Sequence, residues 1–141
     1  MKATRFLTAI TMVLITGFAY SQSLVTEKAD ASFKNGKFNE AIDLYKYAFG
    51  KAKDKLTKNY INYQVAVCYY KINDYRQAET WFRKTTRKDP HSNLAYLYFA
   101  QVLHANNKLD EAEENYKKYL ETNLNDPIGK TGLQSVKNAK E

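Results

Sequence analysis

Small and large apolar residues recur along this chain in a pattern that is repeated three times. In the central copy, Asn73 is followed by Tyr75, Ala78 and Phe82, at offsets of two, five and nine positions. The same offsets occur upstream and downstream, at Gly36, Phe38, Ala41 and Tyr45 and at Asn107, Leu109, Ala112 and Tyr116. The three alanines are 37 and then 34 residues apart, and this period indicates repeated helix pairs rather than one irregular bundle.

Each copy predicts two antiparallel helices that reverse at a Gly or Asn, which tolerates a left-handed backbone. A second alanine lies twelve positions before each of the three, at Ala29, Ala66 and Ala100, so that the two backbones can approach where the helices cross. Asp74 and Ser92 are the predicted N-caps, and Trp81 is expected in the core or between repeats. The apolar spacing predicts helices over Gln22–Asn35, Phe38–Ala52, Lys58–Ile72, Asp74–Arg87, Ser92–Ala105 and Leu109–Glu121.

Two irregularities modify this pattern. Three extra residues precede the second copy, which predicts a longer loop over 51–58, and Asp126-Pro127 comes two places late, which predicts an extended last helix. In the tail, Ile128, Leu133 and Val136 are spaced as on one short amphipathic helix. Because a stack of repeats exposes an apolar face at its end, we expect this helix to cap it.

The small, aromatic and terminal Pro positions resemble the tetratricopeptide repeat, a helix-turn-helix unit of 34 residues. The resemblance covers about residues 22–127. It implies an all-α fold of three repeats, over about 22–57, 58–91 and 92–126, in a right-handed superhelical stack with 127–141 as the capping helix and tail. This family binds many unrelated partners, so the resemblance predicts protein binding but names no partner.

The first 21 residues are expected to be a cleaved signal peptide. Lys2 and Arg5 precede the uncharged apolar run 6–20, which is too short to span a bilayer, and Ala19 and Ser21 are small residues at the positions a signal peptidase requires. The mature chain is therefore expected to begin at Gln22 and to be exported to the periplasm or the periplasmic face of the outer membrane. An uncleaved anchor is the alternative.

The net charge of +7 raises the alternative of a nucleic-acid-binding repeat protein, with Arg83, Lys84, Arg87 and Lys88 as the candidate patch. These residues end a predicted helix, where cations are favoured locally, and export would separate them from nucleic acid. We therefore interpret them as a solvated helix end. The acidic residues Glu111, Glu113 and Glu114 begin a helix and are likewise expected to be solvated.

The sequence predicts a protein without catalytic activity, cofactor or metal. His91 and His104 lack a carboxylate or cysteine at metal-ligand spacing, and there is no Gly-rich phosphate loop. The single Cys68 excludes an internal disulfide and is interpreted as a small core residue rather than a reactive thiol.

The resemblance also implies where a partner would bind, because the first helix of each pair lines the concave surface in this family. Tyrosines are abundant at the matching positions and suit an interface, although packing between repeats is an equally good interpretation of any one ring. The predicted groove residues are Lys34, Tyr60, Tyr63, Gln64, Tyr70, Lys71, Tyr98, Gln101 and His104.

A subgroup of the family holds the C-terminal carboxylate of heat-shock chaperones with Lys, Asn and Arg side chains. The matching positions here are Thr26, Asp30, Gln64, Leu94 and Tyr98, so the clamp is missing and a co-chaperone role is not expected.

The leader, together with residues 116–140, resembles the N-terminal module of larger bacterial envelope proteins that carry a β-propeller and an OmpA-like peptidoglycan-binding domain, some associated with type IX secretion. This implies a scaffold within a larger envelope assembly, and it implies that the chain is part of a longer protein. A periplasmic adaptor that self-associates through the groove is the alternative.

Overall fold

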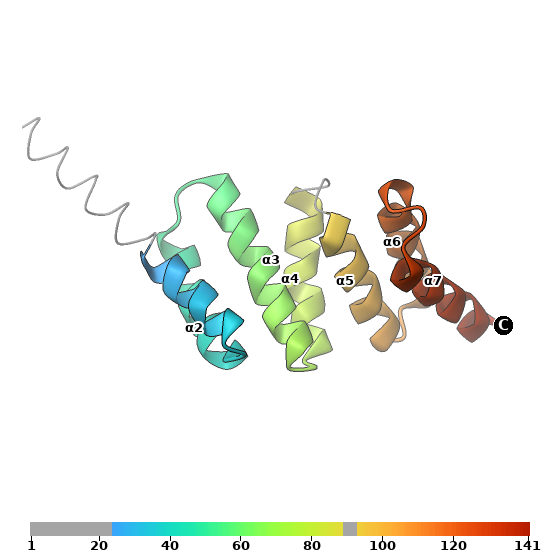
Figure 1. The fold of residues 1–141 in the computed structure, drawn as a ribbon, viewed down its shortest axis with the longest axis horizontal. Coiled ribbons are helices and arrows are strands. Elements are labelled where there is room, and N and C mark those ends of the chain that lie inside the picture. The colour runs from blue at the N-terminus through green and yellow to red at the C-terminus, as the bar shows by residue number, and fades with distance from the viewer. Residues whose placement is uncertain (1–23, 89–92) are drawn as a thin grey trace, which may run out of the picture.

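The computed structural model describes residues 24–88 and 93–141, and these residues form helices joined by short turns, with no strand among them (Figure 1). The predicted leader and Ser92 lie outside the described residues. The helices are a first one over 24–34, then α2 (Phe38–Lys51), α3 (Lys55–Lys71), α4 (Tyr75–Lys88), α5 (Asn93–Ala105), α6 (Leu109–Thr122) and α7 (Pro127–Lys140).

The turns inside the three pairs follow the sequence pattern. Gly36, Asn73 and Asn107 have φ of 72°, 60° and 59°, in the left-handed region that Gly and Asn tolerate best. The Asp74 carboxylate accepts a hydrogen bond from the Gln77 backbone N–H at 3.1 Å, which confirms the predicted N-cap. Each turn therefore reverses the chain by local chemistry alone.

Two predicted helix boundaries are wrong. The long loop over 51–58 is only 52–54, because α3 begins at Lys55 and the Asp54 carboxylate caps it by accepting from the Thr57 N–H at 2.8 Å. The last helix of the third pair is also not extended, since α6 has 14 residues, like α2 and α4. The late Asp126 instead caps α7, accepting from the Gly129 N–H at 2.8 Å.

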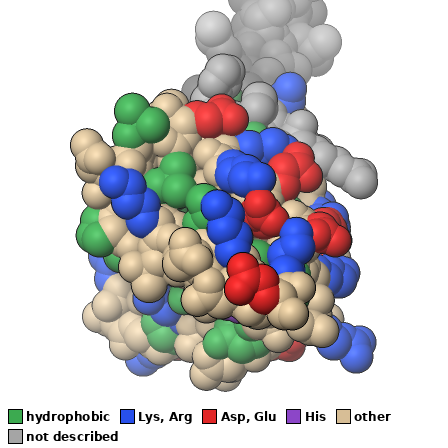
Figure 2. All heavy atoms as spheres, turned by 90° about the vertical axis from the view of Figure 1, so that its right-hand side faces the viewer, with side chains coloured by type: hydrophobic (Ala, Val, Ile, Leu, Met, Phe, Trp, Pro, Cys, Tyr) green, Lys and Arg blue, Asp and Glu red, His purple; other side chains and the backbone are tan. Residues whose placement is uncertain are grey.

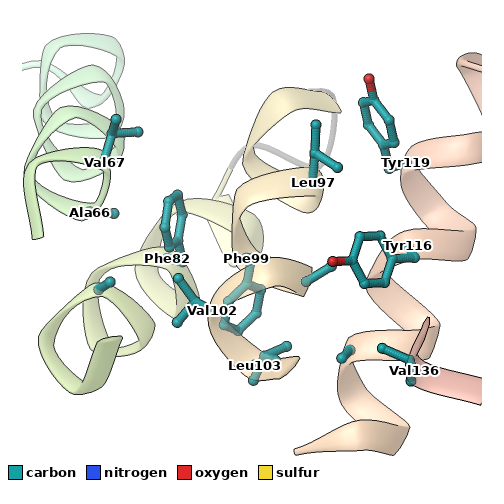
Figure 3. Close-up of a cluster of buried hydrophobic side chains, with 13 residues drawn as sticks. Ala66, Val67, Phe82, Leu97, Phe99, Val102, Leu103, Tyr116, Tyr119 and Val136 are labelled. Atoms are coloured by element: carbon teal, nitrogen blue, oxygen red, sulfur yellow. The ribbon is translucent and has the colours of Figure 1, made fainter. Parts of the chain in front are cut away.

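The core consists of two clusters of buried side chains that share α3. The N-terminal cluster is built by the first helix, α2 and α3, and the C-terminal cluster by α3 to α7. The six crossing alanines, Ala29, Ala41, Ala66, Ala78, Ala100 and Ala112, are all 0% exposed, as the repeat pattern predicts. Figure 3 shows Phe82 in the C-terminal cluster, between Ala66 and Val67 of α3 on one side and Phe99 and Val102 of α5 on the other.

The predicted core roles of two α3 and α4 residues are confirmed. Cys68 is buried in the N-terminal cluster, and burial raises the pKa of its thiol to about 12. Trp81 is half-buried and packs against both clusters, with its ring edge-on to Phe49 at 6.2 Å between centroids. Within the part of the chain that the structure describes, no helix combines the length and apolar character needed to cross a membrane.

Candidate functional site: the surface of the first helices

The predicted groove residues all lie on the first helix of a pair, namely the helix over 24–34, α3 or α5. We call them together the first-helix surface. Lys34 and Lys71 are exposed at the C-terminal ends of their helices, and Tyr60 is 40% exposed on α3. The others are half-buried. Along its length, the first-helix surface has a polar end, an aromatic middle and a hollow at the far end.

At the polar end, two phenols converge on one carboxylate. The Tyr60 hydroxyl donates to Asp30 at 2.6 Å and accepts from the Gln64 amide at 2.8 Å, while the Tyr45 hydroxyl donates to the same Asp30 oxygen at 2.5 Å. Burial, and then the hydrogen bond to Asp30, raises the pKa of both phenols, so both stay neutral donors at physiological pH. We did not predict Asp30 as a groove residue. It does occupy one of the five positions that match the clamp for a chaperone carboxylate.

In the middle, three predicted groove tyrosines pack against one another and against Phe82. The Tyr70 and Tyr98 ring centroids are 5.2 Å apart, Tyr98 stacks on Phe82 at 6.4 Å, and Tyr63 meets Phe82 edge-on at 6.5 Å. Burial raises the pKa of Tyr63 to about 12 and also raises that of Tyr70. These rings therefore fill the joint between repeats two and three and present only part of their surface to solvent.

At the far end, Gln101 and His104 of α5 line a hollow of about 480 Å³. Tyr116 of α6 forms a second wall, and α7 forms the third with Pro127, Ile128, Thr131, Gly132 and Ser135. The Gln101 Oε1 atom is buried and accepts no hydrogen bond from the described residues. Because this atom is itself buried, it does not face the open hollow.

The α7 wall of this hollow was not predicted, and it depends on two glycines. A Cβ atom at Gly132 would lie 2.4 Å from Cζ of Tyr116, and one at Gly129 would lie 2.8 Å from Cδ1 of Tyr119. Only glycine lets α7 approach these rings so closely. The periodic small residues Gly129, Gly132 and Ser135 were the available signal for this contact in the sequence.

The predicted face of α7 is partly correct. Val136 is 0% exposed and Leu133 packs against the C-terminal cluster, but Ile128 is 56% exposed rather than part of the buried face. The helix caps the stack by its contact with α6 and at the same time borders the hollow.

The five clamp positions carry groups unsuited to an incoming carboxylate. Asp30 presents a carboxylate of its own, Leu94 is 54% exposed and apolar, and Tyr98 is packed against Phe82. Thr26 and Gln64 carry no charge. A peptide carboxylate at this end would meet like charge rather than a cation.

We expected both charged runs to be solvated, but the structure shows that several of their side chains have partners. Arg83 pairs with Glu79 at 2.8 Å and with Glu111 at 2.7 Å, and the Lys84 ammonium lies 3.8 Å from the centroid of the Trp81 ring. Glu113 and Glu114 also pair with lysines one turn along α6, Lys117 and Lys118, and Glu113 in addition pairs with Lys140 of α7. The side chains of residues 86–88 lie outside the description. Over residues 24–88 and 93–141, no group of three metal-ligating side chains occurs.

Comparison with known proteins agrees with this architecture. The sequence model of the tetratricopeptide repeat matches residues 66–127, from α3 to the start of α7. No curated protein sequence matches the chain significantly.

Several solved structures share the fold. The C-terminal tetratricopeptide domain of an FK506-binding protein from Plasmodium falciparum is 25% identical, with a TM-score of 0.76 over 86% of this chain and 89% of that one. The second such domain of human RPAP3, in complex with an HSP70 peptide, is 21% identical, with a TM-score of 0.73 over 84% and 97%. The Yersinia enterocolitica type III secretion chaperone SycD, in complex with a peptide of the translocator YopD, is 16% identical, with a TM-score of 0.73 over 86% and 95%. The matched repeats and these structures support the tetratricopeptide repeat family, and the fold of this chain is an all-α stack of these repeats.

Proposed function

We propose that this chain is a non-catalytic scaffold of the bacterial cell envelope that binds a peptide or partner domain on its first-helix surface. The observation that carries this proposal is the hollow bordered by Gln101, His104 and α7 at the end of this surface. The RPAP3 domain and SycD, which share the fold, each bind a peptide.

The chemistry of the surface favours one kind of ligand over another. The polar end offers the Asp30 carboxylate, so donors and cations on the ligand are favoured there. A peptide that ends in a carboxylate is disfavoured, which distinguishes this surface from the clamp that the sequence analysis found missing. We therefore infer a ligand that occupies the hollow and presents a hydrogen-bond donor or a cation towards Asp30.

The envelope location rests on the sequence. Lys2, Arg5 and the uncharged run 6–20 have the order of a signal peptide, and the resemblance of the leader and residues 116–140 to modules of OmpA-like envelope proteins favours the same compartment. N-terminal sequencing of the chain from a periplasmic fraction tests this. A sequence that begins at Gln22 would support export, whereas an intact Met1 in the cytoplasm would contradict it.

Site-specific photo-crosslinking tests the binding surface. A benzoylphenylalanine in place of His104 lies at the hollow, and one in place of Tyr47, which is 58% exposed on α2, is the matched control. We expect the His104 probe to crosslink an envelope protein and the Tyr47 probe to leave it unlabelled. Crosslinks from Tyr47 alone would place the interface on the second helices, and a product of twice the chain mass would favour the self-associating adaptor.

A further inference from the structure

Every exposed Leu or Ile of the described residues lies on one edge of the stack. Their exposed fractions are 42% for Leu24, 81% for Leu56, 54% for Leu94, 70% for Leu124 and 56% for Ile128. Leu56, Leu94 and Ile128 are each the second residue of α3, α5 and α7, and Leu124 lies in the turn before α7. We call these five residues the leucine edge.

The leucine edge follows from the repeat topology. Successive helices are antiparallel, so the first helices of all pairs run in one direction and their starts meet on the same side of the stack (Figure 1). The opposite edge carries the turns at Gly36, Asn73 and Asn107, and none of the exposed Leu or Ile side chains of the described residues lies there. Aliphatic side chains gathered on one edge mark an interaction surface rather than random exposure.

Lysines surround the most exposed member of this edge. Lys51 and Lys55 are exposed and Lys58 is half-buried, and all three lie within five residues of Leu56. The Lys51 and Lys58 ammonium groups lie over the rings of Tyr47 and Phe49, at 5.5 and 5.7 Å, and no carboxylate of the described residues pairs with them. Their ammonium groups can therefore pair with an anion outside the chain.

Two acidic residues beside the edge are engaged by the backbone. Asp54 and Asp126 each accept a hydrogen bond from an N–H of the helix that they cap, and the bond from Thr57 lowers the pKa of Asp54. Glu121, near Leu124, remains exposed, so the positive character is strongest at the α3 end. Exposed aliphatic residues within a group of lysines fit the boundary between acyl chains and anionic headgroups.

The exposed aliphatic residues of the edge and the lysines beside Leu56 together supply the apolar and cationic contacts that an anionic membrane surface binds. We propose that the leucine edge docks the stack on a membrane surface that contains anionic lipids. Because Ile128 belongs to this edge and also borders the hollow, docking there would hold the hollow beside the membrane surface.

Vesicle co-sedimentation tests this proposal with the chain from Gln22, which contains every described helix and both hydrophobic clusters. The probes are vesicles of phosphatidylcholine with phosphatidylglycerol and vesicles of phosphatidylcholine alone. We expect binding to the anionic vesicles only, and we expect it to weaken as salt is raised. Equal binding to both vesicles, or binding to neither, would overturn the proposal.

Three variants separate the edge from bulk charge. Leu56→Ser/Leu94→Ser/Ile128→Ser removes aliphatic groups, and Lys51→Gln/Lys55→Gln/Lys58→Gln removes cations; each should weaken vesicle binding at least tenfold. Lys37→Gln/Arg76→Gln/Lys137→Gln removes the same charge from exposed positions on the opposite edge and should stay within twofold of the unmodified chain. Circular dichroism confirms that each variant is folded.

The control also decides between a lipid and other occupants. An equal loss in the control variant would reduce the effect to net charge and overturn the proposal. Crosslinking of a protein to the leucine edge without any vesicle binding would also overturn the proposal, because the edge would then be a protein interface.

Discussion

The two halves of the stack hold most of their lysines by different means, although Lys37 in the N-terminal half pairs with Glu40 and Lys118 in the C-terminal half also lies over the Tyr96 ring. In the N-terminal half, lysine ammonium groups lie over aromatic rings, at 5.2 Å for Lys46 and Tyr69, 5.7 Å for Lys58 and Phe49, and 3.8 Å for Lys84 and Trp81. In the C-terminal half, lysines pair with carboxylates, at 2.7 Å for Lys117 and Glu113, 2.6 Å for Lys118 and Glu114, and 2.8 Å for Lys140 and Glu113. Figure 2 shows this C-terminal end, where side chains of both charges are interspersed.

The difference indicates separate tasks for the two ends. A lysine over a ring keeps its charge available to a partner, because the aromatic quadrupole attracts the cation without neutralising it. A lysine paired with a carboxylate contributes to holding elements together, and Lys140 connects α7 to Asp110 and Glu113 of α6. We infer that the C-terminal charges help to dock α7, whereas the N-terminal charges remain available for binding.

The largest expected effect concerns the core that joins the halves. Phe82 is 0% exposed, and its replacement by Ala should cost about 3–5 kcal/mol, since it leaves a cavity among the surrounding rings. Because α3 contributes to both clusters, the loss should also open the N-terminal half. Alkylation of Cys68, which is buried in that half and has a pKa of about 12, measures this.

We expect Cys68 to be protected in the unmodified chain and to react faster in Phe82→Ala at moderate denaturant concentrations. If circular dichroism shows a loss of helix while Cys68 stays protected, only the C-terminal half has unfolded. The halves would then be independent, and the inferred coupling through α3 would be wrong.

The next effect is confined to the C-terminal half. Gly132→Ala would place a Cβ against the buried Tyr116 ring, and overpacking of this kind costs about 1–3 kcal/mol, partly offset by the better helix propensity of Ala. Amide hydrogen exchange should rise along α7, while Cys68 remains protected. Gly50→Ala is the matched control, because a Cβ there meets nothing within 4 Å.

The comparison of halves also shows which features the sequence could predict. The alanine joints and the turns at Gly36, Asn73 and Asn107 follow from short-range spacing and backbone preference, and all of them are confirmed. The start of α3 was missed because Leu56 is exposed and breaks the apolar stripe. Asp54 three residues before Thr57 was the only capping signal in that lysine-rich stretch.

The candidate site was predictable only where it depends on one helix. Gln101 and His104 were expected on α5 from the resemblance to the family, and both line the hollow. The α7 wall depends instead on how Gly132 meets Tyr116, a contact that neither segment encodes alone. In the same way, the sequence alone could not decide whether Tyr98 faces a partner or packs between repeats, because the answer depends on Tyr70 and Phe82 beside it.

A smaller effect is expected at the ion network between the halves. Glu79 is 9% exposed and accepts from Arg83, Asn106 and Lys108, at 2.8, 2.8 and 2.5 Å. Burial alone would raise the pKa of Glu79, but these hydrogen bonds outweigh it and lower the pKa. Glu79→Gln should therefore cost about 1–2 kcal/mol at pH 7 by urea unfolding.

The exposed Lys37–Glu40 pair, at 3.6 Å, provides the control for Glu79→Gln. Glu40→Gln should change stability little, because such surface pairs contribute little. Equal losses in the two variants would mean that the contacts of Glu79 with the turn after α5 add nothing to its ion pair with Arg83.

The smallest expected effect tests whether charge holds α7. Hydrogen bonds from Lys117 and Lys140 lower the pKa of Glu113 from 4.5 to about 2. Because the folded pKa is the lower one, its contribution is complete at neutral pH and is lost as pH falls from about 5 towards 2. The Tm of Glu113→Gln should lie slightly below that of the unmodified chain at pH 7 and converge with it near pH 2.

Glu114→Gln is the control, because Glu114 pairs at 2.6 Å with Lys118 within α6 only. Hydrogen exchange in α7 should increase in Glu113→Gln and stay unchanged in Glu114→Gln. Equal exchange in the two variants would show that the glycine contact, and not the ion pair, holds α7 on the stack.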